Sequence, residues 1–162
     1  GNDTLDLILT QKSFLCYNKK IALECFIDGT CMVFMKSSDF LSLFGNILDN
    51  AIEAVQNFPT EKRTISLRIG ERNGSIFIHA ENPCGELCFR DGLPQTTKAD
   101  KAYHGFGVRS IRYIVKKYGG EVSMYTEGRK FHVDILFYSG AGDGKQEARA
   151  VPGSHAFLSH KK

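Results

Sequence analysis

Long apolar runs are missing from this chain of 162 residues. A helix that spans a membrane needs roughly 18 or more consecutive apolar residues, and no stretch of the sequence approaches that length. The first residues, GNDTLDLILTQK, also lack the pattern of a secretion signal. The sequence therefore predicts a soluble chain, and it is equally compatible with one soluble piece of a longer membrane protein.

The net charge of the chain is small as well. The formal net charge is +3, and residues 139–162 account for +2 of it through four basic and two acidic side chains, which leaves +1 for residues 1–138. Domains that bind nucleic acid usually carry a marked basic excess. Nucleic acid is therefore not expected as a partner.

The cysteine pattern supports neither disulfides nor a cysteine zinc site. Five cysteines are an odd number, and no close pair of them is repeated. We expect free thiols in a reducing cytoplasm. The five are Cys16, Cys25, Cys31, Cys84 and Cys88.

Helical periodicity predicts three amphipathic helices, over about 3–19, 39–57 and 105–118. Residues 37–39, Ser-Ser-Asp, offer N-caps for the second helix, and Gly-Gly at 119–120 ends the third.

Alternating apolar residues predict three pairs of strands joined by short turns. The pairs cover residues 21–34, with a turn at Asp28-Gly29, residues 63–82, with a type I′ turn at Asn73-Gly74, and residues 121–138. Strands joined in this way form a mostly antiparallel sheet, and three helices can cover one of its faces. The predicted fold is α/β: a two-layer sandwich formed by one domain over residues 1–138.

Two segments have no sustained periodicity. Residues 82–104 are predicted to be a long loop, and such loops are usually functional or disordered. Residues 139–162 are rich in Gly, Ala, Ser and Lys and are predicted to be a disordered tail. This tail is either part of the natural protein or an artificial addition to it.

The second predicted helix contains the segment LFGNILDNAIEAVQ, residues 43–56. On a helical wheel Asn46, Asn50 and Glu53 fall within about 60° of one another, opposite a broad apolar face. A solvated polar stripe is one interpretation, but Lys, Gln or Glu would serve it better than Asn, a mediocre helix former. An Asn amide offers an oxygen to a hard cation and an NH₂ group to a phosphate oxygen.

A second segment, YHGFGVRSIRYIVKKYGG, places Gly105 and Gly107 where the loop is expected to become a helix. Glycines there allow close backbone approach while the first free N–H groups of the helix point at an anion. A flexible turn is an equal alternative. The Walker phosphate loop is absent, and no strand immediately precedes the glycines as a dinucleotide fingerprint requires.

Together the two segments resemble a known family. NILDNAIEA resembles the N-box, and HGFGVRSIRYIVKKYGG the second glycine box, of the GHKL (Bergerat) ATP-binding fold shared by gyrase, ATP-driven chaperones and histidine kinases. The segments LFGNILDNAIEA and HGFGVRSI together most resemble the catalytic domain of bacterial sensor histidine kinases of the peptide-pheromone (quorum-sensing) receptor type. The resemblance covers residues 1–138 and implies three helices on a mixed sheet.

The resemblance implies roles for single residues. Asn50 matches the asparagine that coordinates Mg²⁺ bridging the nucleotide phosphates, and Asn46 matches the one beside the phosphates a turn earlier. In the ATP-hydrolysing branches the position of Asn46 is a glutamate that activates water. Because an amide is no general base, the sequence favours phosphoryl transfer to a protein over hydrolysis. Glu53 is a further nucleotide-binding candidate, with a structural carboxylate as an equal alternative.

The first glycine box of the family, Asp-x-Gly-x-Gly, is replaced here by AENPCGE. Asn82 aligns best with the adenine-binding Asp, and its oxygen can accept the same hydrogen bond without the charge; Glu81 is the neighbouring candidate. Residues 83–104 would form a lid over the nucleotide. The candidates from the lid and the second glycine box, each with a solvated or structural alternative, are Lys98, Lys101, His104, Gly105, Phe106, Gly107 and Val108.

None of the five histidines has the setting expected of a phosphoacceptor. By resemblance the acceptor lies upstream, on a dimerising helical domain. The expected function is that of the ATP- and Mg²⁺-dependent catalytic domain of a cytoplasmic histidine kinase module without direct membrane contact. It would serve a membrane sensor, work as a homodimer at full length, and feed a response regulator. The alternatives are a non-catalytic nucleotide-binding pseudokinase module and a serine kinase of the anti-sigma-factor type.

Overall fold

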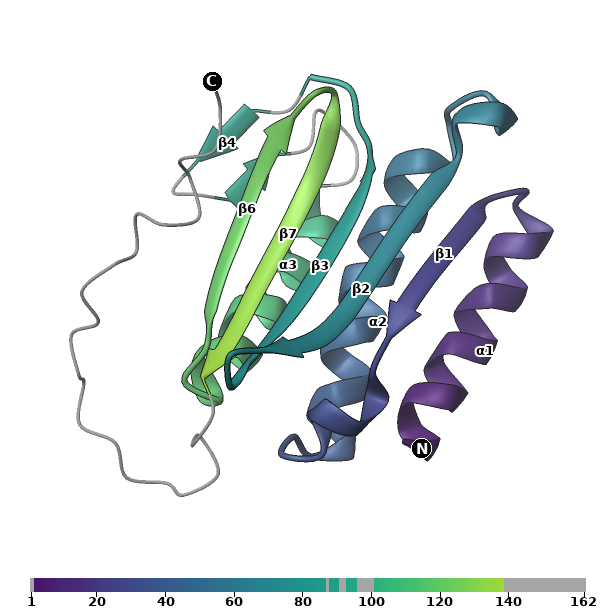
Figure 1. Cartoon of the computed structure of the whole chain (residues 1–162). Coiled ribbons are helices and arrows are strands. Elements are labelled where there is room, and N and C mark those ends of the chain that lie inside the picture. The colour runs from purple at the N-terminus through teal and green to yellow at the C-terminus, as the bar shows by residue number, and fades with distance from the viewer. Residues whose placement is uncertain (1, 87, 91–92, 96–100, 139–162) are drawn as a thin grey trace.

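The computed structural model describes the backbone of residues 2–86, 88–90, 93–95 and 101–138, and the side chains of residues 2–86 and 107–138 (Figure 1). In chain order the elements are α1 (Asp3–Asn18), β1 (Ala22–Ile27), the 3₁₀ helix η1 (Gly29–Met32), α2 (Ser37–Val55), the 3₁₀ helix η2 (Thr60–Lys62), β2 (Thr64–Arg72), β3 (Ser75–Pro83), β4 (Cys88–Arg90), β5 (Leu93–Gln95), α3 (Lys101–Lys117), β6 (Glu121–Glu127) and β7 (Lys130–Tyr138).

Five strands form one mixed sheet in the order β1-β2-β3-β7-β6. The pair β1–β2 is parallel, and the other three pairs are antiparallel. Helices α2 and α3 lie behind this sheet in Figure 1, and α1 lies beside β1. The prediction of a mixed, mostly antiparallel sheet covered on one face by three helices is confirmed.

The core lies between the sheet and the helices. The apolar face predicted for α2 is buried throughout, and it meets the inward side chains of β2, among them Ile65 and Leu67. Burial of this face, at roughly 1.5–3 kcal/mol for each large side chain, holds α2 against the sheet. The buried residues of that face include Phe40, Phe44, Ile47, Leu48, Ala51 and Val55.

The two later hairpins and the end of α3 follow local sequence signals. Asn73 and Gly74 both have positive φ, 53° and 74°, as a type I′ turn requires, and they join β2 to β3. Gly119 ends α3 with φ of 68°, and its N–H donates to the carbonyl of Lys116 at 3.0 Å. These predictions are confirmed.

The prediction of a second strand within residues 21–34 is wrong. Asp28 instead accepts a hydrogen bond from the N–H of Thr30 at 3.1 Å and starts η1. Met32 is buried in the core, and β1 pairs in parallel with β2, with Ala22 opposite Thr64. The apolar residues after the turn are thus used for core packing, and the partner of β1 comes from beyond α2.

The predicted start of α2 also needs correction. The helix begins at Ser37, and its N-cap is Lys36, which makes no side-chain capping bond. Asp39 lies in the first turn and accepts hydrogen bonds from α3 and the residue after it, so tertiary contacts replace the expected cap.

The expected loop over residues 82–104 is only partly irregular. It contains the short antiparallel pair β4–β5, and α3 begins inside it at Lys101. The predicted tail, residues 139–162, lies outside the described residues. No helix in the described part of the chain has the length and apolar character needed to cross a membrane. Four described cysteines, Cys16, Cys25, Cys31 and Cys84, are free thiols as predicted, and Cys88 has no described side chain.

Candidate functional site

Helices α2 and α3 are tied together in an antiparallel arrangement. Near the start of α2, the Asp39 carboxylate accepts hydrogen bonds from Lys117 Nζ at 2.8 Å and Tyr118 Oη at 2.6 Å, at the end of α3. One turn further along α2, the hydroxyls of Ser42 and Ser110 lie 3.3 Å apart. The register of these contacts brings the middle of α2 opposite the early part of α3.

The contact at Asp39 also changes the acidity of the groups involved. The hydrogen bond from Lys117, followed by that from Tyr118, lowers the pKa of the Asp39 carboxyl below its ordinary value. The same bond raises the pKa of the Lys117 amine, although partial burial opposes it. Both groups are therefore held in their charged forms around neutral pH.

Opposite the middle of α2, the backbone of Gly107 lies against the two asparagines. A Cβ at Gly107 would be 3.0 Å from Asn50 Oδ1, 3.4 Å from Asn50 Nδ2 and 3.5 Å from Asn46 Oδ1. A distance of 3.0 Å is tighter than about nine in ten real Cβ contacts, so a side chain at Gly107 requires a small movement of Asn50. The structure thus brings Asn46, Asn50 and Gly107 together.

Neither asparagine is buried, and neither is fully solvated. Both are partly exposed, and Asn46 Nδ2 donates to Ser42 Oγ at 3.4 Å. The Oδ1 atoms of both amides lie within 3.5 Å of the same point, the Cβ position of Gly107. Two neutral oxygens that converge in this way suit a hard cation, and the partial exposure leaves them accessible.

The prediction that Gly105 and Gly107 mark the change from loop to helix is wrong. Helix α3 begins at Lys101, so the N–H groups without helical partners belong to residues 101–104. A glycine costs a helix only about 1 kcal/mol relative to alanine. The buried side chains of Ile111 and Val115 help to anchor α3, and the helix continues through both glycines.

The two candidates in the first glycine box lie on opposite faces of the sheet. Along β3, Ala80 and Asn82 are buried on the helix-covered face, and Asn82 is only 4% exposed. Glu81 points to the open face, where its carboxylate contacts Lys130. Asn82 is therefore the residue on the same face as the asparagines of α2. Its Nδ2 donates to the carbonyl of Pro83 at 2.9 Å.

The remaining predicted residues are only partly described. Glu53 is partly buried on α2, one turn after Asn50, and Val108 is buried with 8% exposure. Lys98 lies outside the described residues. Four more have a helical backbone in α3 but no described side-chain environment: Lys101, His104, Gly105 and Phe106.

At least two cavities lie among the described residues. One, of about 530 Å³, lies at the end of α1 and is lined by Tyr17 and Ile21, among others. The other, of about 160 Å³, lies near the ends of β1, β2 and β3 and is lined by Glu81, Asn82 and Lys130, among others. Neither is lined by the asparagines of α2, so the candidate site rests on the contact between α2 and α3.

Sequence reasoning did not identify Asp39, Ser42 or Ser110 as residues that position the site. Their contacts join positions 68 or more residues apart. The signal was indirect: Ser42 precedes Asn46 by one helical turn, and Ser110 follows Gly107 by about one turn.

Comparison with known proteins agrees with the fold and with the two motifs. The model of the GHKL domain matches residues 35–138, more than half of the chain. The chain therefore belongs to the GHKL domain family.

The relatives are sensor histidine kinases. Sensor histidine kinase CitA of Klebsiella pneumoniae is 27% identical over 116 residues, which cover 64% of this chain and 21% of CitA. Sensor histidine kinase DpiB of Escherichia coli K12 is 28% identical over 98 residues, which cover 56% of this chain and 17% of DpiB. The chain spans about a fifth of the length of these relatives.

Solved structures share the fold at low sequence identity. The catalytic domain of histidine kinase ThkA superposes with a TM-score of 0.64 at 13% identity, over 85% of this chain and 91% of that one. Histidine kinase AdeS of Acinetobacter baumannii gives the same TM-score and identity, over 85% of this chain and 64% of AdeS. The chain thus shares its fold with histidine kinase catalytic domains.

Proposed function

We propose that residues 1–138 are the ATP-binding catalytic domain of a sensor histidine kinase, and that this domain transfers the γ-phosphate of ATP to a histidine on an upstream dimerisation domain. In this proposal the full-length protein is a homodimer that passes the phosphate to a response regulator, and the chain is the cytoplasmic part of a membrane-bound sensor. The amino-acid sequence of the two motifs further suggests a peptide-pheromone receptor kinase.

The observation that carries the proposal is the contact of Gly107 with Asn46 and Asn50. It joins the two motifs at one point, with amide oxygens that fit a Mg²⁺-nucleotide. Asn50 would be the metal ligand, and Asn46 would lie beside the phosphates. When bound, Mg²⁺ neutralises charge on the transferring phosphate.

Asn46 sets the type of reaction in this proposal. An ionised carboxylate at this position could accept a proton from water, whereas an amide has no titrating proton and cannot. The partial exposure of Asn46 admits water to its surroundings without activating it. The domain therefore favours transfer to a protein acceptor over hydrolysis.

The other assignments follow the same face of the sheet. Asn82, on the helix-covered face, would accept the hydrogen bond from the adenine amino group through Oδ1, because its Nδ2 is used by Pro83. Glu53 and the backbone at Val108 would line the nucleotide from α2 and α3. The lid candidates would meet the phosphate charge: Lys98, Lys101 and His104.

One observation favours a second function, that of a non-catalytic nucleotide-binding module. The charged residue of the first glycine box is replaced by Asn82, which weakens selection for adenine. Such a module would bind nucleotide and leave the acceptor histidine unphosphorylated.

The test compares Asn50→Ala with Asn57→Ala, an exposed asparagine just after α2. Titration with a non-hydrolysable ATP analogue should show binding that Mg²⁺ strengthens, and Asn50→Ala should remove this dependence while Asn57→Ala keeps it. In the full-length kinase, Asn50→Ala should abolish acid-labile phosphorylation of the acceptor.

The outcomes separate the alternatives. Normal phosphorylation in Asn50→Ala would remove this residue from the site. Mg²⁺-dependent nucleotide binding without phosphorylation of the wild-type acceptor would select the non-catalytic module.

A further inference from the structure

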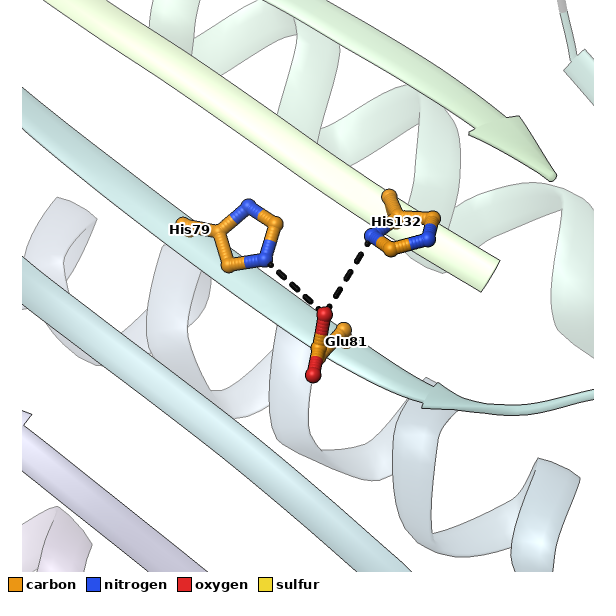
Figure 2. Close-up of side chains that lie close together, drawn as sticks. All are labelled: His79, Glu81 and His132. Carbon is orange, nitrogen blue, oxygen red and sulfur yellow. Dashed lines mark hydrogen bonds and ion pairs between the residues drawn. The ribbon is translucent and has the colours of Figure 1, made fainter. Parts of the chain in front are cut away.

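The open face of the sheet carries a cluster of titratable side chains that the nucleotide site does not use. His79 and Glu81 are two residues apart on β3 and point to the same side. In the pairing of β3 with β7, Glu81 lies directly opposite His132, and His79 lies opposite Asp134. Figure 2 shows the rings of His79 and His132 on either side of the Glu81 carboxylate.

Three ligand atoms converge in this cluster. Glu81 Oε2 lies 3.3 Å from His79 Nε2 and 3.5 Å from His132 Nδ1, as the dashed lines in Figure 2 mark. All three atoms lie within 4.8 Å of one another. His132 Nδ1 is buried and makes no hydrogen bond.

The second nitrogen of each ring is held by an oxygen. His79 Nδ1 bonds to the Asp134 carboxylate, which also accepts a hydrogen bond from Tyr125 Oη at 2.7 Å. His132 Nε2 lies 3.3 Å from the carbonyl oxygen of Glu127. When these outer nitrogens carry the protons, the inner nitrogens that face Glu81 are left with free lone pairs. Such outer oxygen partners orient the histidine ligands of metal sites.

We propose that His79, Glu81 and His132 bind one Zn²⁺ ion, with a fourth position left for water or another ligand. Zinc takes histidine nitrogens and carboxylate oxygens at about 2.0–2.2 Å, and tetrahedral geometry at such bond lengths separates two ligand atoms by roughly 3.3–3.6 Å. The two distances at Glu81 Oε2 already have these values. The two nitrogens lie at most 4.8 Å apart.

The charges around the cluster fit a cation. Glu81 and Asp134 supply two carboxylates, and Lys130 contacts Oε1 of Glu81 at 3.2 Å, which leaves Oε2 for the metal. A magnesium ion would prefer oxygen ligands and octahedral geometry, so two imidazoles select against it. This site is therefore separate from the Mg²⁺-nucleotide site, on the opposite face of β3.

The experiment uses the whole 162-residue chain, kept reduced with a phosphine. Equilibrium dialysis against Zn²⁺ with excess Mg²⁺, followed by elemental analysis, should find one zinc per chain. Binding should weaken at least tenfold in His79→Gln, Glu81→Gln and His132→Gln. The matched control is Glu61→Gln, which removes an exposed carboxylate in η2, outside the cluster. It should keep the wild-type affinity.

Cobalt replaces zinc to identify the ligands. Bound Co²⁺ should show visible bands of a nitrogen and oxygen ligand set, without the intense near-ultraviolet band of a thiolate ligand. Circular dichroism identifies any variant that does not fold. The zinc affinities of those cluster variants that do fold test the proposal. If none of them folds, the cobalt spectrum of the wild type decides.

Three results would overturn the proposal: no stoichiometric zinc in the wild type, unchanged zinc affinity in the folded cluster variants, or a thiolate band that assigns the metal to cysteine.

Discussion

Replacing Gly107 by alanine adds one methyl group between α3 and the asparagines of α2. The new Cβ would lie 3.0 Å from Asn50 Oδ1, so the Asn50 side chain must shift by a few tenths of an ångström. Asn50 is partly exposed rather than part of the apolar core, so the fold should persist. Alanine in place of glycine also favours the helix by about 1 kcal/mol. The expected change in the free energy of unfolding is therefore small or favourable.

The loss should appear in nucleotide binding instead. In the proposed site a displaced Asn50 would lose its place as a ligand of Mg²⁺ on the phosphates, and the loss of one polar interaction with a charged group costs about 1.5–3 kcal/mol. The Kd of the Mg²⁺-ATP analogue should rise roughly 10- to 150-fold. Titration calorimetry gives the Kd, and urea denaturation gives the stability.

Gly45→Ala is the matched control. Gly45 lies in α2, and a Cβ there would meet only Ile8 Cδ1, at an ordinary 3.9 Å. This variant should keep nucleotide affinity and gain stability. Wild-type affinity in a folded Gly107→Ala protein would refute the role assigned to the contact between Gly107 and Asn50.

Two further predictions concern the start and the middle of α2. With Asn46 as an amide, the purified domain should release phosphate from Mg²⁺-ATP at a negligible rate; release at roughly 1 s⁻¹, the lower end of ordinary enzyme turnover, would move the chain to the ATPase branch. At Asp39, hydrogen bonds from Lys117 and Tyr118 lower the carboxyl pKa. Because this pKa is lower in the folded chain, its contribution to stability is present above the ordinary value of about 3.9 and disappears as the pH falls through the folded pKa. Asp39→Asn should therefore lose less stability than the wild type between pH 5 and pH 3, roughly the range around the ordinary pKa. Urea denaturation at each pH measures this, and equal losses would contradict the contact.

Local signals explain which parts of the fold were predicted. Asn73, Gly74 and Gly119 have positive φ, which Asn and Gly adopt readily. The turn and the helix end could therefore be located without knowledge of the rest of the structure. The residues after the Asp28-Gly29 turn gave the wrong answer because a buried apolar residue such as Met32 looks the same in a short strand as in a 3₁₀ helix. The parallel pairing of β1 with β2 depends on the whole of α2 between them.

The candidate site also has some features that the sequence shows and others that depend on the fold. Asn46 and Asn50 are one helical turn apart, so their shared face was visible in the sequence. Their contact with Gly107 depends on how two helices cross, and the cluster of His79, Glu81 and His132 depends on the register of β3 and β7. The spacing of His79 and Glu81 shows that they share a face, but it does not show which strand lies beside them.

The alternation along β3 makes adjacent positions 81 and 82 chemically independent. Glu81 can be varied without a change in the helix-covered face, and Asn82 without a change in the open face. This arrangement depends on the number of residues in β3. A single-residue insertion or deletion between the Asn73-Gly74 turn and Glu81 would move the side chains that follow it to the opposite face of the sheet. It would turn the Glu81 carboxylate towards the helix-covered face and the Asn82 amide towards the open face, where His132 lies. Length changes in β3 should therefore be tolerated far less well than substitutions.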